Sequence, residues 1–209
     1  MFNKIFLWLR GLFHSKKDIS LGFYGSPNAG KTSLANRISI DLTGNPLGQI
    51  SVIPHETRMV QKKEKVSVKL KNCTLTMNLL DMPGLAVKVD YRDFLNYGLN
   101  IRDAQQRAKE ATKGIVEALK WLDKVDTALV ILDSTKDPFN QVNITLLGNL
   151  EARGIPVILV ANKMDLEDAN TKEIKKTFPD YPIVEVSALT GDNMHNLYQT
   201  IVVEAKRKK

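Results

Sequence analysis

The residues best suited to chemistry in this chain lie in one short segment, Gly25-Ser26-Pro27-Asn28-Ala29-Gly30-Lys31-Thr32. Its spacing of glycine, four residues, then glycine-lysine-threonine is typical of a loop that wraps around phosphate groups. Glycine lets the backbone approach closely, and backbone N–H groups at a helix start attract the anion. We expect Lys31 to neutralise the β- and γ-phosphates and the Thr32 hydroxyl to bind Mg²⁺. The other residues expected to contact the nucleotide here are Asn28, Ala29, Gly30 and Ser33.

A second polar motif, Asp81-Met82-Pro83-Gly84, directly follows the apolar run 74–80. An acid at the carboxyl end of a strand lies near the ligand crevice of a parallel sheet. We therefore expect Asp81 to orient a Mg²⁺-bound water, and the N–H of Gly84 to reach the γ-phosphate. Alone, Asp-x-x-Gly is a common turn. Behind a phosphate loop and a strand, it predicts a sensor of the third phosphate.

A third motif, Asn162-Lys163-Met164-Asp165, favours guanine as the base. The Asp165 carboxylate can accept hydrogen bonds from the guanine N1–H and 2-amino group. Adenine lacks this donor pair and would leave a buried acid unpaired, which is costly. We expect the stem of Lys163 to cover the base and Asn162 to tie its loop to the phosphate loop. Backbone N–H groups of one further segment are expected to contact the guanine oxygen: Ser187, Ala188 and Leu189.

These motifs need a sheet whose strands end at one edge. The apolar runs predict strands at 19–24, 58–70, 74–80, 128–132, 156–161 and 183–186, and the helical patterns fall at 31–40, 101–122, 141–153, 171–177 and 193–206. Alternating strands and helices indicate an α/β fold with a mostly parallel sheet and helices on both faces. The turn signal Lys71-Asn72 predicts a hairpin that adds one antiparallel edge strand.

In this order the motifs resemble the translation-factor-related class of P-loop GTPases, and within it the Era-like branch, over roughly residues 18–205. The resemblance implies GTP hydrolysis with Mg²⁺. It also implies that Thr57, in the segment 54–58, binds Mg²⁺ and the γ-phosphate and acts with Lys31 and Gly84 in catalysis. Thr43 is the alternative, but it lies only 11 residues past Thr32 and no predicted strand follows it.

Two departures from the resemblance limit what it implies. Ras-like members orient the attacking water with a glutamine where this chain has Leu85, so we expect slow hydrolysis unless a partner, a dimer or a monovalent cation assists. Similar members use an asparagine at the place of Asn28 to help hold K⁺, and the alternative is that Asn28 only stabilises its loop. Era carries a KH domain after its GTPase domain. This chain stops at Lys209, so we expect no KH domain here.

Both ends of the chain are basic. Of the net charge of +7, residues 1–17 supply +4 and residues 204–209 supply +3, which leaves residues 18–203 neutral. On a helical wheel residues 1–17 are amphipathic, and the members of the apolar face are Phe2, Ile5, Phe6, Trp8, Leu9, Leu12 and Phe13. The pattern fits an interfacial helix on an anionic membrane, or a helix that packs on a protein partner or on its own domain.

The chain is therefore expected to consist of a tail, 1–17, and a GTPase domain, 18–209. Two hypotheses for its function follow. The first hypothesis is a GTPase switch, cytoplasmic or peripheral to a membrane. The second is a GTP-binding scaffold, or an RNA- or ribosome-associated factor, with little hydrolysis. The single Cys73 and the lack of an apolar run of about 20 residues fit the cytoplasm.

Overall fold

A computed structural model of the chain describes residues 19–48, 57, 59–70, 73–86 and 88–207. Several sequence-based predictions lie outside these residues. They concern the amphipathic helix at 1–17, residues 54–56 and Arg58 of the segment around Thr57, the turn Lys71-Asn72 and the last two lysines.

A six-stranded sheet in the order β2-β3-β1-β4-β5-β6 organises the molecule. The strands are β1 (Ile19–Tyr24), β2 (Gln61–Leu70), β3 (Cys73–Asp81), β4 (Thr127–Asp133), β5 (Val157–Asn162) and β6 (Ile183–Glu185). All neighbours pair in parallel except β2 with β3, so the predicted mostly parallel sheet with one antiparallel edge strand is confirmed. β2 begins later than predicted because Gln61 pairs with Asp81, the last residue of β3.

The helices follow the strands as expected. They are α2 (Lys31–Thr43), α4 (Ile101–Lys120), α5 (Gln141–Ala152), α6 (Thr171–Thr177) and α7 (Met194–Arg207), with the short α3 (Arg92–Leu95) and a 3₁₀ turn, η1 (Leu122–Lys124). Asparagine side chains cap the N-termini of α4, α5 and α6 by accepting backbone N–H bonds, an arrangement that favours a helix start. α2 runs past its predicted end to Gly44, whose left-handed φ of 78° ends it.

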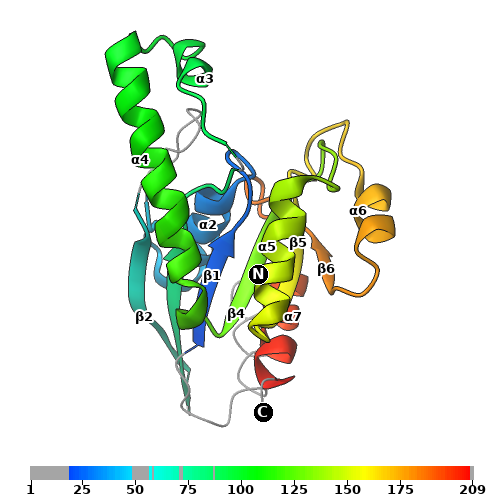
Figure 1. Cartoon of the computed structure of the whole chain (residues 1–209). Helices are drawn as coiled ribbons and strands as arrows, with labels where there is room; N and C mark the ends of the chain where they lie inside the picture. The colour runs from blue at the N-terminus through cyan, green and yellow to red at the C-terminus, as the bar shows by residue number, and fades with distance from the viewer. Residues whose placement is uncertain (1–18, 49–56, 58, 71–72, 87, 208–209) are drawn as a thin grey trace.

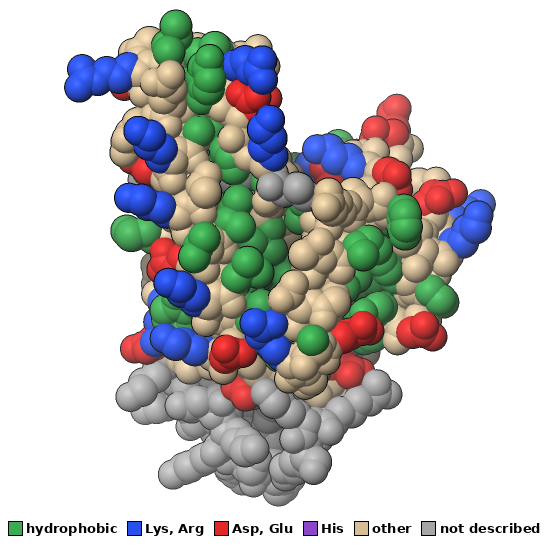
Figure 2. Space-filling view, in the orientation of Figure 1, with side chains coloured by type: hydrophobic (Ala, Val, Ile, Leu, Met, Phe, Trp, Pro, Cys, Tyr) green, Lys and Arg blue, Asp and Glu red, His purple; other side chains and the backbone are tan. Residues whose placement is uncertain are grey.

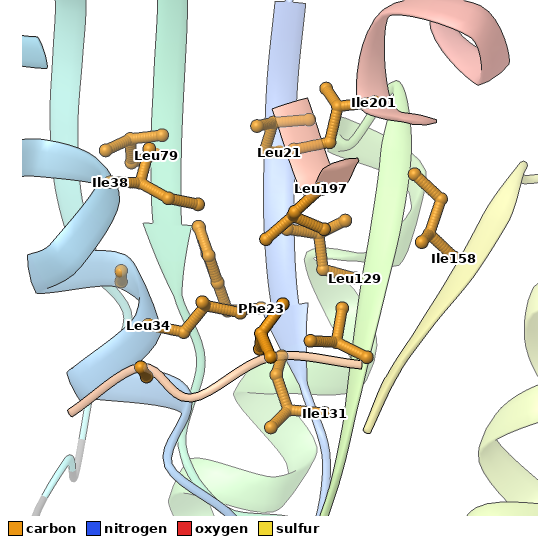
Figure 3. Packing of buried hydrophobic residues seen from close by; sticks show 14 of the residues in the cluster. Leu21, Phe23, Leu34, Ile38, Leu79, Leu129, Ile131, Ile158, Leu197 and Ile201 are labelled. Atoms are coloured by element: carbon orange, nitrogen blue, oxygen red, sulfur yellow. The ribbon is translucent and has the colours of Figure 1, made fainter. Parts of the chain in front are cut away.

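The helices cover both faces of the sheet, as predicted. α2 and α7 lie on one face, and α4, α5 and α6 lie on the other (Figure 1). Alternate residues of the strands supply the two cores, because successive side chains of a strand point to opposite faces. Leu21, Phe23 and Leu129 belong to the core under α2 and α7 (Figure 3), whereas Ala128 and Val130 belong to the other.

The first half of α4 extends past the edge of the sheet together with α3, and the two form a projecting helical hairpin (Figure 1). This hairpin, residues 88–111, has a small core of its own. Its members are Phe94, Ala104 and Ala111, with Val89, Leu95, Leu99 and Ala108 packed against them. Lys and Arg side chains stand along its flanks (Figure 2). The sequence did not predict α3.

β1 begins and α7 ends at the same end of the sheet, opposite the glycine-rich loop (Figure 1). No helix among residues 19–207, as far as they are described, is long and apolar enough to cross a membrane.

Candidate nucleotide-binding site

The glycine-rich loop connects the end of β1 to the start of α2. Gly25 and Gly30 have φ values of 145° and 96°, which L side chains rarely adopt. A Cβ on Gly25 would collide with the Ile131 carbonyl of β4, and one on Gly30 with the Asn162 side chain of β5. The loop therefore packs against the ends of two strands in a way that only glycine permits.

Lys31, the first residue of α2, folds back over this loop. Its Nζ donates to the Ser26 carbonyl oxygen at 2.8 Å, and the residue is buried. Burial lowers the pKa of Lys31 to about 8, although the nearby Asp81 opposes the shift. A buried ammonium aimed across an N–H-rich loop is suited to an anion such as a phosphate.

Three oxygen-bearing side chains meet beside the loop. The Thr32 hydroxyl donates to Asp81 Oδ2 at 2.6 Å, and the Thr57 hydroxyl lies 3.2 Å from Thr32 Oγ1 and 3.5 Å from Asp81 Oδ2. Asp81 is fully buried, burial raises its pKa, and its Oδ1 has no hydrogen-bond partner among the described residues. Hydroxyl and carboxylate oxygens around an unpartnered acceptor fit Mg²⁺, which prefers oxygen ligands.

The competing threonine lies elsewhere. Thr43 is the last residue of α2, where its hydroxyl donates to the Ser39 carbonyl and accepts from Lys63 of β2. Thr57, and not Thr43, is the threonine that contacts Thr32 and Asp81 in this structure.

The chain leaves β3 directly over the phosphate loop. A Cβ on Gly84 would lie only 3.1 Å from Pro27 Cα, and the Leu85 N–H donates to the Gly25 carbonyl at 3.0 Å. The Leu85 side chain is buried in the core that α4 and α5 cover. An apolar side chain held there cannot position a water molecule beside the loop.

Asn162, the last residue of β5, joins the phosphate loop to the loop after β6. Its Nδ2 donates to the Ala29 carbonyl, and its Oδ1 accepts from the Ala188 N–H, both at 3.0 Å. Asn162 is buried, so both bonds are shielded from water. One amide thus sets the spacing between two loops that the sequence assigns to the phosphates and to the base.

The remaining predicted base contacts gather around Asp165. Its Oδ1 accepts from the Ser187 hydroxyl at 2.6 Å, and that hydroxyl accepts from the Thr190 N–H at 3.1 Å. Oδ2 and the remaining acceptor capacity of Oδ1 can still take the two guanine donors. Leu189 has an exposed side chain, so only its backbone is suited to contact the base.

The other two predicted contacts lie on the loop and on α2. Asn28 is exposed and has a left-handed φ of 60°, and Ser33 is half-buried in the first turn of α2.

Asp133, at the end of β4, is a further site residue that the sequence motifs did not predict. Its Oδ2 accepts from Lys163 Nζ at 2.6 Å, which fixes the lysine stem that would cover the base. Burial acts to raise the pKa of Asp133, but the bonds from Lys163 and Thr135 outweigh it and the pKa is lowered. An acid at the carboxyl end of a strand was the available signal.

A parallel sheet with a phosphate loop after its first strand, and polar loops after β3, β5 and β6, is the fold of a P-loop nucleotide-binding protein. The chain belongs to the 50S ribosome-binding GTPase family, which matches residues 20–163. It is similar to GTPase Der of Desulforapulum autotrophicum, with 27% identity over 193 residues, 88% of this chain and 34% of that protein. It is also similar to GTPase Era of Rickettsia conorii, with 26% identity over 201 residues, 94% of this chain and 51% of that protein.

Solved structures share this fold. Era in complex with MgGDPNP and a segment of 16S ribosomal RNA superposes with a TM-score of 0.69 at 25% identity, covering 91% of this chain and 57% of that one. Aquifex aeolicus Era bound to GDP and AlF₄⁻ gives 0.67 at 24% identity, covering 88% and 56%. The chain spans about half or less of the length of these curated relatives.

Proposed function

We propose that this protein binds GTP and GDP with Mg²⁺, hydrolyses GTP, and acts as a nucleotide-dependent switch. The observation that carries the proposal is the meeting of Thr32, Thr57 and Asp81 beside the phosphate loop. Thr32 and Thr57 would hold Mg²⁺ directly and Asp81 through a bound water, and the ion neutralises phosphate charge when bound. Lys31 would contact the β- and γ-phosphates, and the Gly84 N–H would respond to the third phosphate. GTP and GDP would then favour different arrangements of the segments that carry Thr57 and Gly84.

Hydrolysis by the isolated protein should be slow, within about tenfold of the ~10⁻⁴ s⁻¹ of unassisted small GTPases. The support is Leu85, whose buried side chain cannot orient water. A protein partner, a nucleotide-dependent dimer or K⁺ would supply the missing assistance. Asn28, exposed at the tip of the loop, is the residue that would help to hold K⁺. Equal rates of hydrolysis in K⁺ and Na⁺ would rule out activation by K⁺ but would leave the expectation of slow hydrolysis unchanged.

Specificity for guanine is proposed to rest on Asp165, with Asn162, Lys163 and the loop 187–189 in support. The Ser187 hydroxyl orients the carboxylate through Oδ1, and the carboxylate keeps enough acceptor capacity for both guanine donors. Asp165→Asn should shift preference from GTP to xanthosine triphosphate, because xanthine carries an oxygen where guanine has its amino group. Competition of the two nucleotides against a labelled GTP analogue measures this.

The decisive test of the switch compares two threonines. Thr57→Ala should lower the rate of phosphate release by about tenfold or more and weaken Mg²⁺-dependent binding of GTP over GDP. Thr43→Ala is the matched control, because among the described residues Thr43 bonds only within α2, to β2 and to the loop after α2. Equal effects of the two variants on phosphate release would contradict the proposal.

A second candidate is a GTP-binding scaffold or RNA-associated factor with little hydrolysis. The observation in its favour is the similarity to an Era structure that contains 16S ribosomal RNA. The neutral charge of residues 18–203 weighs against it.

We propose that the tail, 1–17, attaches the GTPase domain, 18–209, to an anionic membrane or to a protein while the domain stays in the cytoplasm. Flotation with anionic vesicles, against a chain that starts at Asp18, separates these alternatives.

A further inference from the structure

The projecting hairpin contains a groove that the nucleotide site does not use. It has a volume of about 620 Å³ and lies between the segment that follows Gly84 and one side of α4. The residues that line it are Lys88, Val89, Asp90, Tyr91, Arg92, Gln105, Ala108 and Lys109. Gln105 and Lys109 are one helical turn apart, so they form one wall, and the segment 88–92, which leads into the first residue of α3, forms the other.

The groove carries an excess of positive charge. Its single acid, Asp90, is already bound by Arg92, whose Nη2 lies 2.6 Å from Asp90 Oδ2 and whose Nε lies 3.0 Å from Oδ1. Lys88 and Lys109 are exposed and make no ion pair with a described residue. Two cations on opposite walls are therefore available to an anionic ligand.

The floor of the groove is apolar. Val89 and Ala108 are partly buried against the small core of the hairpin, and Tyr91 stands at the rim with 36% of its surface exposed. Cations flanking an apolar floor match a peptide that carries both carboxylates and an apolar side chain. Single-stranded RNA would need successive aromatic platforms for its bases, and the lining offers one tyrosine. The basic tails of this chain do not match the charge of the groove.

We propose that this groove is a docking site for an acidic peptide segment of a protein partner. Lys88 and Lys109 pair with its carboxylates, and an apolar side chain rests on Val89 and Ala108. The groove begins four residues after Gly84, which packs against the phosphate loop. On the proposed function, the third phosphate would therefore alter how the groove is presented to the partner.

The test uses the full chain, and the probe is a fluorescein-labelled peptide that repeats the unit Glu-Glu-Leu. Anisotropy should show binding that weakens as salt rises from about 0.05 M to about 0.5 M. The double variant Lys88→Glu, Lys109→Glu should bind the peptide with an affinity that is at least about tenfold lower. The matched control, Lys172→Glu with Lys176→Glu on the exposed side of α6, should bind as the native protein does. Amide NMR shifts should fall on residues 88–92 and 105–109.

Equal losses in the two double variants, or NMR shifts confined to the basic tails, would overturn the docking site. The proposal would also fail if the acidic peptide did not bind and an oligouridylate bound in a way that depends on Lys88 and Lys109. The partner would then be a nucleic acid. Binding of a fluorescent GTP analogue is measured in parallel. Peptide binding without GTP binding supports the groove and rejects the proposed function, and the reverse result rejects the groove alone.

Discussion

The nucleotide-binding edge of the sheet and the projecting hairpin are built in different ways. At the edge, loops are joined by buried hydrogen bonds, such as those from Asn162 to Ala29 and Ala188. The hairpin rests on a small cluster around Phe94, and most of its polar side chains are exposed. A network of buried polar bonds holds atoms in one geometry, whereas a small separate core opens at lower free energy. The edge of the sheet is suited to chemistry that needs atoms in fixed positions. The hairpin is suited to binding a partner in a way that depends on its conformation.

The connection between the two regions is short. Leu85 donates its N–H to the Gly25 carbonyl, and its side chain enters the main core. The segment then continues through Val89 into the hairpin core. We therefore expect a movement of Gly84 to reach the hairpin through few residues. This arrangement predicts that damage at the edge alters both regions, but damage in the hairpin alters only one.

The largest expected effect is that of Asn162→Ala. The change leaves the Ala29 carbonyl and the Ala188 N–H buried without partners, at about 1–3 kcal/mol each. The free energy of unfolding should fall by about 2–5 kcal/mol, and GTP should bind about 100-fold more weakly because the two loops lose their spacing. Denaturant titration and nucleotide titration measure these effects.

The same substitution at Asn96, an exposed residue of the hairpin, is the control. Asn96→Ala should leave both quantities close to those of the native protein. If it proved as damaging as Asn162→Ala, the two regions would not differ as described.

A second effect, smaller for the rest of the molecule because it stays local, is expected for Phe94→Ala, which removes the largest side chain of the hairpin core. Large-to-small changes of a buried phenylalanine cost about 3–5 kcal/mol. Here that loss should stay local, because Phe94 packs in a cluster separate from the two main cores. Hydrogen exchange should accelerate in residues 92–111 while β4 and β5 keep their protection. Equal acceleration in β4 would mean that the hairpin and the sheet unfold as one unit.

The two regions also differ in how far the sequence predicts them. The edge was predictable because each motif directly follows a strand and its chemistry demands particular residue types, as at Lys31 and Asp165. The hairpin was not, because α3 has only four residues and so shows no periodicity. The inward stripe of α4 consists mainly of small residues, with Arg107 among Ala104, Ala111, Gly114 and Ala118. Such a stripe does not reveal whether a sheet or another helix covers it.

The smallest effect concerns the pH dependence of Lys31, a buried cation whose pKa is about 8 in the nucleotide-free protein. Phosphates bind the charged form, so the affinity for GTP should fall by up to about tenfold per pH unit above pH 8. The nucleotide-free protein should respond in the opposite sense. Between pH 8 and the ordinary lysine value of 10.5 the unfolded chain binds more protons, so this group makes the free energy of unfolding rise with pH.

Lys31→Arg provides the comparison, because a guanidinium stays charged throughout this range. This variant should bind GTP more weakly at pH 7 yet lose little further affinity by pH 9, and any loss that remains reports other titrating groups, including the base. Nucleotide titrations at pH 7, 8 and 9 measure both proteins under equal salt. Native and variant protein could instead lose affinity for GTP in parallel as the pH rises. The burial of Lys31, which the exposed lysines of the hairpin do not share, would then have no effect on phosphate binding.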